Sequence, residues 1–349
     1  MKDLSLENTI LTRNNRIDAL ANLGDYLSSP DEPLEDLIAS APYQNAWFTP
    51  ENTRKAITSI GGMLNRSDLE QWLAPAALPE ENTNPKSIGL VLAGNIPMVG
   101  FHDILCVLAS GNKALIKLSS QDQKLIPFIL NKLIELEPGF TDRFEFIERL
   151  TAFDAVIATG SGNTSRYFEY YFKSVPHIIR KNRNSIAVLD GTETETELKA
   201  LGHDIFDYFG LGCRNVSKVY VPEGYDFRAF FEAIQEFHPV SDHHKYNNNY
   251  DYNKSIFLVN LDKHLDNGFL LLKKDERIAS PLAVLYFEDY VSLTALVPSL
   301  QPLDQQVQCL VSKVKLPLDI PQFAFGQTQE PGLWDYADRV DTMAFLRNL

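Results

Sequence analysis

The sequence contains few cysteines: only Cys106, Cys213 and Cys309 occur among 349 residues, and they lie far apart. An odd number of widely spaced cysteines argues against a disulfide framework or a zinc site and favours a reducing compartment. The sequence also lacks an apolar run of about 20 residues, the length needed to cross a bilayer. Its N-terminus, MKDLSLENTI, has no apolar segment followed by a small-residue cleavage site. We therefore expect a cytoplasmic protein without a membrane span.

Basic residues are in the minority, with 32 Lys and Arg against 46 Asp and Glu and a formal net charge of −14. Because clustered Lys and Arg hold phosphate backbones, this balance excludes a general nucleic-acid binder. Apolar residues make up 44% of the chain, which is enough to bury a large core. At roughly 100 to 200 residues per domain, the length indicates about two domains.

The order of the hydrophobic patterns predicts an α/β protein. Residues up to about 80 show helical spacing, as at Leu20, Leu23 and Leu27, and indicate a helical N-terminal segment. From Ser87 onward, short apolar strands alternate with amphipathic helices, which is typical of doubly wound parallel sheets with right-handed crossovers. The strands expected in the first half are 87–94, 113–119, 154–161 and 185–191.

The second half continues the α/β pattern. The strands expected there are 217–222, 255–260, 281–288 and 307–313, and the polar segment 245–253 is interpreted as a surface loop. The predicted domains are residues 1–204, which include the helical segment, and residues 205–330. Residues 331–349 are expected to return to the first domain or to form an interface.

Cys213 is a candidate nucleophile. It follows a Gly-Leu-Gly turn and precedes Arg214, and a neighbouring cation favours the reactive thiolate. Taken alone, a cysteine in an apolar context is more often a packing residue. That interpretation is the better one for Cys106 and Cys309, which lie within apolar helix and strand patterns.

Polar residues at three strand ends are further candidates, because ligands bind at the carboxyl ends of parallel strands. The Asn95 amide could donate to an oxyanion or simply shape its turn. Lys117 could bind a ligand or face solvent. The Thr159–Gly162 turn offers backbone N–H groups to a pyrophosphate, although it lacks the GxGxxG spacing of a dinucleotide fingerprint.

Taken in order, these motifs resemble the aldehyde dehydrogenase superfamily. A strand followed by Gly-Asn-Ile-Pro, a second within GNKALIKLSS, a third followed by ATGSGNTSR and a cysteine after Gly-Leu-Gly match the arrangement of that superfamily. Within it, the chain is most similar to the LuxC-like acyl-CoA reductases from about Ile88 to the C-terminus. The most specific passages are ALIKLSSQD, GLGCRNVSKVYVP and RVDTMAFL. The resemblance implies an aldehyde dehydrogenase-like fold with a cofactor-binding first domain and a catalytic second domain.

The resemblance also implies roles for individual residues. Cys213 corresponds to the nucleophile, and Asn95 to the asparagine whose amide helps to form the oxyanion hole. Lys117 corresponds to the lysine that binds the adenosine ribose of the cofactor. Gly160 and Ser161 correspond to the small-residue turn beside the cofactor phosphates.

Two departures from the superfamily pattern concern acidic residues. Hydrolytic aldehyde dehydrogenases carry a glutamate general base where this chain has Arg180 or Lys181, so water activation is unsupported. Glu276 is the candidate for the glutamate that binds the nicotinamide ribose in the superfamily. The exact alignment of this segment with the superfamily is left open. NAD-preferring members have another glutamate three residues after the ribose-binding lysine, where this chain has Ser120 beside Ser119. Small hydroxyls leave room for a 2′-phosphate, which favours NADPH and keeps NADH as the alternative.

The function implied is NADPH-dependent reduction of an acyl-CoA, or another acyl thioester, to a fatty aldehyde through a thioester on the cysteine. The alternatives are another superfamily oxidoreductase, acting on an aldehyde or an acyl phosphate, and an acyl-binding protein or acyltransferase without redox chemistry. A homodimer is left open. The adjacent His243 and His244 have no further ligands at matching spacing, so no metal site is expected.

Overall fold

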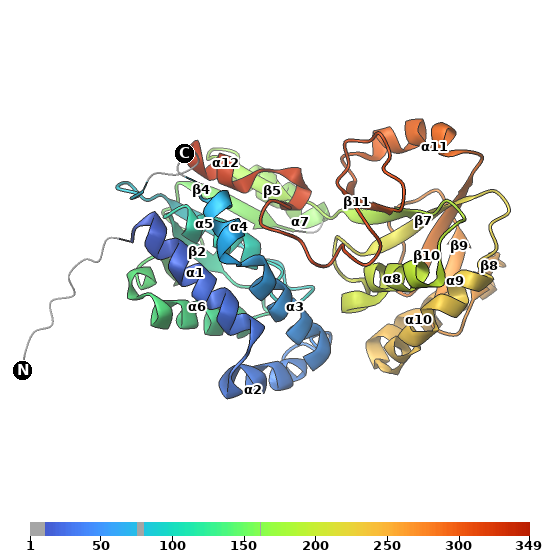
Figure 1. The fold of residues 1–349 in the computed structure, drawn as a ribbon, viewed down its shortest axis with the longest axis horizontal. Helices are drawn as coiled ribbons and strands as arrows, with labels where there is room; N and C mark the ends of the chain where they lie inside the picture. Colours follow the sequence, from blue (N-terminus) through green and yellow to red (C-terminus); the bar gives the residue numbers. More distant parts are fainter. Residues whose placement is uncertain (1–10, 75–79, 161) are drawn as a thin grey trace, which may run out of the picture. The chain divides into compact units, whose positions relative to one another are not determined.

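Two structural units make up the chain. The computed structural model describes residues 11–74, 80–160 and 162–349, and Figure 1 shows its ribbon. The first unit comprises the residues up to Lys181 together with Pro331–Leu349, and the second comprises Asn182–Glu330. The chain passes from the first unit to the second between Lys181 and Asn182. This position corrects the predicted boundary after residue 204, because strand β6 (Asn184–Val188) already lies in the second unit's sheet.

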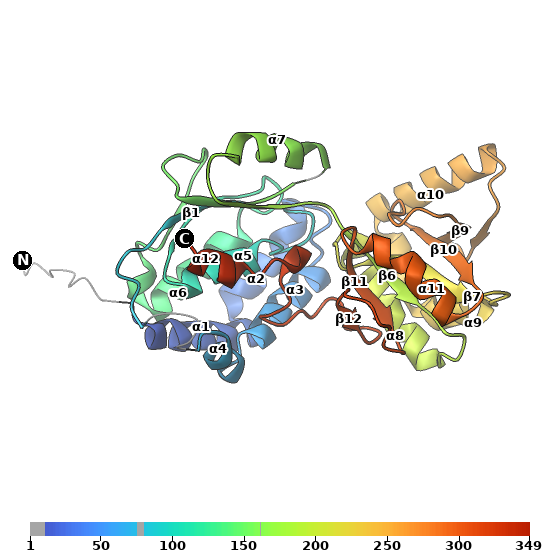
Figure 2. The same ribbon diagram turned by 90° about the horizontal axis from the view of Figure 1, so that it is seen from above.

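The first unit is built on a parallel five-stranded sheet in the order β3-β2-β1-β4-β5. Its strands are β1 (Ser87–Val91), β2 (Lys113–Lys117), β3 (Phe144–Phe146), β4 (Ala155–Thr159) and β5 (His177–Arg180). The chain moves outward from β1 to β2 and β3, and then returns to the other side of β1 for β4 and β5. Right-handed crossovers therefore place α5 (Phe101–Ala109) and α6 (Leu125–Leu136) on one face and α7 (Gly162–Phe172) on the other, as Figure 2 shows. The doubly wound prediction is confirmed, although the sequence patterns missed the short strands β3 and β5.

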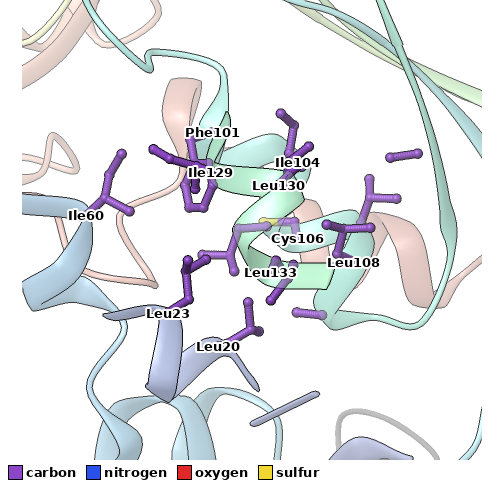
Figure 3. Close-up of a cluster of buried hydrophobic side chains, with 14 of the residues drawn as sticks. Leu20, Leu23, Ile60, Phe101, Ile104, Cys106, Leu108, Ile129, Leu130 and Leu133 are labelled. Carbon is purple, nitrogen blue, oxygen red and sulfur yellow. The ribbon is translucent and has the colours of Figure 1, made fainter. Parts of the chain in front are cut away.

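The helical N-terminal segment completes the core on one face of this sheet. Its helices are α1 (Arg13–Ser28), α2 (Glu32–Ser40), α3 (Pro50–Met63) and α4 (Arg66–Trp72). Helix α1 begins at a capping box formed by Thr12 and Asn15. Figure 3 shows Leu20 and Leu23 of α1 packed with side chains of α5 and α6, and Cys106 lies in this cluster with no exposed surface. Cys106 is thus the packing residue that the sequence indicated.

A buried ion pair fastens the C-terminal segment to the first unit. The Arg180 guanidinium, at the end of β5, donates to both carboxylate oxygens of Asp103 on α5, at 3.0 and 2.6 Å. The same guanidinium donates to the Ala337 carbonyl and, at 2.9 Å, to the Thr342 hydroxyl at the start of α12 (Thr342–Arg347). One side chain therefore joins the sheet, a crossover helix and the C-terminal segment.

The second unit contains a seven-stranded sheet in the order β12-β11-β6-β7-β10-β9-β8, in which only β8 runs antiparallel to its neighbour. Its other strands are β7 (Val216–Pro222), β8 (His264–Asp266), β9 (Leu271–Lys274), β10 (Val284–Tyr290), β11 (Val307–Ser312) and β12 (Gln322–Phe323). Its helices are α8 (Glu195–Phe206), α9 (Arg228–Ala233), α10 (His244–Val259) and α11 (Leu293–Leu300). Alternate residues of β6 enter different apolar clusters, Ile186 in one and Ala187 in the other, so both faces of the sheet are buried.

Helix α10 corrects two sequence-based predictions, the loop at 245–253 and the strand at 255–260. Its buried residues are Tyr246, Tyr250, Asn253 and Phe257. Their spacing of three or four residues is helical, but the asparagines between them hid the pattern from an apolar count. No helix within the described ranges is long and apolar enough to span a membrane.

Replacing Asp103 should destabilise the first unit. Asp103→Asn leaves the Arg180 cation without its counter-charge at a site where the two side chains are only 11% and 4% exposed. Breaking a buried pair in this way costs about 3–5 kcal/mol. All three tryptophans, Trp47, Trp72 and Trp334, lie in the first unit, so tryptophan fluorescence during urea unfolding reports on that unit.

The matched control is Asp18→Asn. The ion pair of Asp18 with Arg66 is more than half exposed on both sides, and such pairs contribute about 0–1 kcal/mol. Equal urea midpoints for the two variants would contradict the structural role given to Asp103.

Candidate active site

The first unit gathers most of the predicted cofactor residues at one edge of its sheet. Strands β1, β2 and β4 are parallel neighbours, and Val91 is level with Lys117 on one side and with Ala158 on the other. The strand order reverses here, and ligands bind to α/β sheets at such reversals. The predicted residues at these three strand ends are Asn95, Lys117, Ser119, Ser120 and Gly160. Ser161 lies outside the described residues.

The loops that follow β1 and β2 are packed directly on each other. A Cβ added to Gly94 would lie 2.5 Å from Ser119 Oγ and 2.9 Å from Gln121 Cβ. The Ser119 hydroxyl also accepts a hydrogen bond from the Gln121 N–H at 3.2 Å. The loop that carries Asn95 and the loop that carries Ser119 and Ser120 therefore have little freedom to move independently.

The turn after β4 brings a helix end to the same edge. Gly160 allows α7 to pack closely, because a Cβ at this position would lie 3.0 Å from both Thr164 and Phe168. Helix α7 begins directly after this turn, and its first N–H groups carry the positive end of the helix dipole. Lys117 and Ser120 are exposed at the neighbouring strand end, where the four residues 117–120 include no carboxylate. These groups fit a nicotinamide dinucleotide.

Asp122 connects the two loops and was missed by the sequence analysis. Its carboxylate is 4% exposed and accepts a hydrogen bond at 2.9 Å from the N–H of Met98. Met98 lies three residues after Asn95 and has a left-handed backbone, with φ of 60°. Burial raises the pKa of Asp122 to about 6. An aspartate two residues after a serine pair carries no pattern that marks it as buried.

The titration of Asp122 should make stability depend on pH. Between pH 4 and 6 the folded protein holds a proton at Asp122 that the unfolded chain has lost, so the stability contributed by this group falls as the pH rises. In Asp122→Asn the side chain does not titrate, so its contribution to stability does not fall as the pH rises. The amide oxygen can still accept a hydrogen bond from the Met98 N–H. We expect the unfolding free energy of the variant, relative to wild type, to rise by about 2–3 kcal/mol from pH 4 to pH 7. Urea unfolding at both pH values tests this, and a pH-independent difference would contradict it.

In the second unit, Cys213 lies in a tight loop between α8 and β7. Tyr208 and Phe209 have left-handed backbones, with φ of 53° and 58°, followed by Gly210 at 76°. The rings of Tyr208 and Phe209 are buried, which holds the chain in this reversal. Cys213 itself is half-buried. The Arg214 guanidinium beside it lies 5.6 Å from the centre of the Phe323 ring.

A hydrogen-bonded chain of buried side chains supports the Cys213 backbone. The Ser185 hydroxyl on β6 donates to the Cys213 carbonyl at 3.0 Å and also lies 3.0 Å from the Cys309 sulfur. Because the single Ser185 proton is directed to a carbonyl, the Cys309 thiol is the donor in the second contact. Burial raises the pKa of Cys309 to about 12, which keeps that thiol protonated. Cys309 is therefore a structural thiol, as expected.

Only Cys213 should react with iodoacetamide in the folded protein at pH 8. Cys106 and Cys309 have no exposed surface, and burial raises the thiol pKa of both. Peptide mass spectrometry after brief labelling should show modified Cys213 alone, and all three cysteines should be modified in urea. Labelling of Cys309 at the rate of Cys213 would contradict this assignment.

Asn215 is a second residue that the sequence analysis missed. Its buried amide group bonds to Gly212, one residue before Cys213, and to the end of α8. The signal available was an asparagine in a turn just before a strand, which is common in loops and does not by itself indicate a site.

Glu276 follows β9 in the second unit, and its side chain is exposed. Its carbonyl accepts a hydrogen bond at 2.9 Å from Lys218, a fully buried lysine on β7 that also bonds to Glu288 at 2.6 Å. This contact fixes the backbone at Glu276.

The remaining candidates have structural roles. Arg180 is bound by Asp103, as described above. The His243 side chain accepts from the Tyr246 N–H at the start of α10. Among the residues that the structure describes, no group of three His, Cys, Asp or Glu side chains could hold a metal ion.

A family model described as acyl-CoA reductase (LuxC) matches residues 43–236, more than half of the chain. The match contains both Asn95 and Cys213 and ends before Glu276. A comparison with curated proteins finds no match.

Several solved structures share the fold at low sequence identity. Aldehyde dehydrogenase 21 from Physcomitrella patens, in complex with the reaction product succinate, is 11% identical over 96% of this chain and 84% of that chain, with a TM-score of 0.68. An NADP-dependent enzyme from E. coli is 12% identical over 90% and 78%, with a TM-score of 0.64. An indole-3-acetaldehyde dehydrogenase complexed with NAD+ is 12% identical over 88% and 73%, with a TM-score of 0.62.

The two-unit α/β architecture is thus that of aldehyde dehydrogenases. The loops that carry Asn95 and Cys213 both fall within the family match. The chain belongs to the acyl-CoA reductase (LuxC) family and is an oxidoreductase that acts on acyl and aldehyde groups with a nicotinamide cofactor.

Proposed function

We propose that the protein reduces the acyl group of an acyl-CoA, or of another acyl thioester, to a fatty aldehyde with NADPH and through a thioester on Cys213. The observation that carries this proposal is the contrast among the three cysteines. Cys106 and Cys309 are buried packing residues, whereas Cys213 is partly exposed in a tight loop within the family match. A nucleophile must be reachable by its substrate, and only Cys213 meets this condition.

In the acylation step, the Cys213 thiolate attacks the carbonyl carbon of the thioester and forms a new carbon–sulfur bond. The oxyanion that develops accepts a hydrogen bond from the Cys213 backbone N–H. Such donors act mainly in the transition state, where the negative charge appears. When the tetrahedral species collapses, the bond to the CoA sulfur breaks, and CoA leaves as a thiolate that takes a proton from solvent.

The cofactor residues serve the second half of the reaction. The reduced nicotinamide supplies the hydride that converts the acyl group to the aldehyde level. Lys117 and Ser120 hold the adenosine ribose and its phosphate, and the Gly160 turn with the first N–H groups of α7 holds the pyrophosphate. Glu276 binds the nicotinamide ribose. Release of the aldehyde breaks the carbon–sulfur bond and returns Cys213 to its starting state.

The absence of a water-activating carboxylate supports reduction in preference to hydrolysis. Where hydrolytic aldehyde dehydrogenases carry their glutamate base, this chain has Arg180 or Lys181. The Arg180 guanidinium is held by Asp103, so this position has a structural role. A thioester on Cys213 then persists until it is reduced or passed to a thiol.

The preference for NADPH rests on the residues after β2. A glutamate in place of Ser120 would repel a 2′-phosphate, whereas Ser119 and Ser120 offer hydroxyl donors beside the Lys117 cation. Similar folds accommodate either cofactor, since one of the solved structures is an NADP-dependent enzyme and another contains NAD+. The side chains at this edge therefore decide the preference.

Single-turnover mixing with acyl-CoAs of increasing chain length tests the proposal. Intact mass measures acylation without cofactor, and absorbance measures oxidation of NADPH or NADH. Wild-type protein should gain one acyl group at Cys213 and oxidise NADPH faster than NADH. Cys213→Ser should lower turnover by more than about 10³-fold, because the nucleophile is lost.

The control is Cys106→Ala, which removes a buried thiol and leaves Cys213 in place. This variant should be acylated like the wild type. Acylation without oxidation of either cofactor would indicate an acyltransferase, and neither reaction would indicate an acyl-binding protein. Each result would overturn the reductase proposal.

A further inference from the structure

Asn215 closes a four-residue turn around Cys213. Its backbone N–H donates to the Gly212 carbonyl at 3.1 Å. Its side-chain oxygen accepts from the Gly212 N–H at 2.8 Å. Both polar groups of Gly212 are therefore bonded to the same residue, on the far side of the nucleophile.

The other end of the Asn215 side chain is anchored in the core. Its amide nitrogen donates to the carbonyl of Asp204 at 3.1 Å and to that of Asp207 at 2.9 Å, where α8 ends. The residue is 2% exposed. Helix ends leave carbonyls without helical partners, and Asn215 satisfies two of these. The side chain is thus fixed by a rigid element and passes that constraint to the turn.

The bond from the Asn215 backbone N–H to the Gly212 carbonyl determines the direction of the Cys213 N–H. The Gly212 carbonyl and the Cys213 N–H belong to one planar trans peptide, so they point in opposite directions. The Asn215 side chain holds the turn in which this bond forms, because it ties the Gly212 N–H to the end of α8. On the other side of the nucleophile, Ser185 holds the Cys213 carbonyl at 3.0 Å. The backbone of Cys213 is therefore held on both sides.

We propose that Asn215 is a positioning residue. Its side chain anchors the turn to α8, so that its backbone N–H stays on the Gly212 carbonyl and the Cys213 N–H is aimed at the oxyanion of the acylation step. The proposal rests on the function proposed above, because only an acyl acceptor develops this oxyanion. Asparagine is the side chain that suits the position, since it combines an acceptor for Gly212 with two donors for the helix carbonyls. Aspartate has no donors, and leucine has neither donor nor acceptor.

Two reactions of the same thiol separate orientation of the N–H from general damage to the loop. Acylation by an acyl-CoA needs the oxyanion donor, whereas alkylation by iodoacetamide displaces iodide and forms no oxyanion. In Asn215→Ala, we expect the single-turnover acylation rate to fall by about 10²-fold or more, as for loss of an oxyanion-hole donor. The alkylation rate of Cys213 should change by less than threefold.

The matched control is Asn253→Ala. Asn253 is a buried asparagine of the same unit, and its amide also donates to two backbone carbonyls, those of Asn249 and Leu282, both at 2.9 Å. These two bonds lie outside the Gly212–Asn215 turn, so this variant should lose a similar amount of stability and keep the wild-type acylation rate. If Asn215→Ala does not fold, Ser185→Ala removes the support on the other side of Cys213 and should show the same selective loss of acylation.

The outcomes separate this proposal from the one on which it rests. Wild-type protein that is alkylated at Cys213 but never acylated would overturn the proposed function. If wild-type protein is acylated, an equal loss of both reactions in Asn215→Ala would overturn the orienting role, and so would an unchanged acylation rate. A fall in acylation alone, absent in Asn253→Ala, supports it.

Discussion

The ion pair between Arg180 and Asp103 is the contact on which the organisation of the first unit depends. It joins the last strand of the sheet, a crossover helix and the C-terminal segment through one buried guanidinium. The chain leaves this unit after Lys181 and re-enters it at Pro331. The Lys181 N–H donates to Asp338, so the outgoing chain is also tied to the returning segment. The Arg180 side chain therefore has an architectural role in this chain.

The candidate residues of the two units are positioned by different structural devices. In the first, parallel strands align the ends of β1, β2 and β4, so residues distant in sequence reach one edge without any strain in the sheet. In the second, Cys213 is held by a reversal with left-handed residues and by side chains that bond its neighbours. Under the proposed function, the first device suits a cofactor, which requires a broad surface, and the second suits a nucleophile, which requires one fixed peptide.

Much of this could be predicted from the sequence, and the exceptions have physical reasons. Short apolar strands and the turns after them indicated the doubly wound fold and placed Asn95, Lys117 and Gly160 at strand ends. Helix α10 was missed because its buried face includes two tyrosines and an asparagine, whose polar atoms find partners within the protein only after folding. Asp122 and Asn215 were missed for the same reason. Asp122 bonds to the backbone of the loop after β1 and Asn215 bonds to the end of α8, and no local pattern encodes these contacts.

The close packing of Gly94 against Ser119 links the segment after β2, which is proposed to set cofactor preference, to the loop that carries Asn95. Nicotinamide preference is altered by exchanging residues after the second strand, and here that segment rests on the glycine next to Asn95. A bulkier residue in place of Ser119 would push against backbone that has no side chain to yield. Under the proposed function, a change of cofactor preference at Ser119 would also disturb the loop that carries Asn95, so the two segments are best redesigned together.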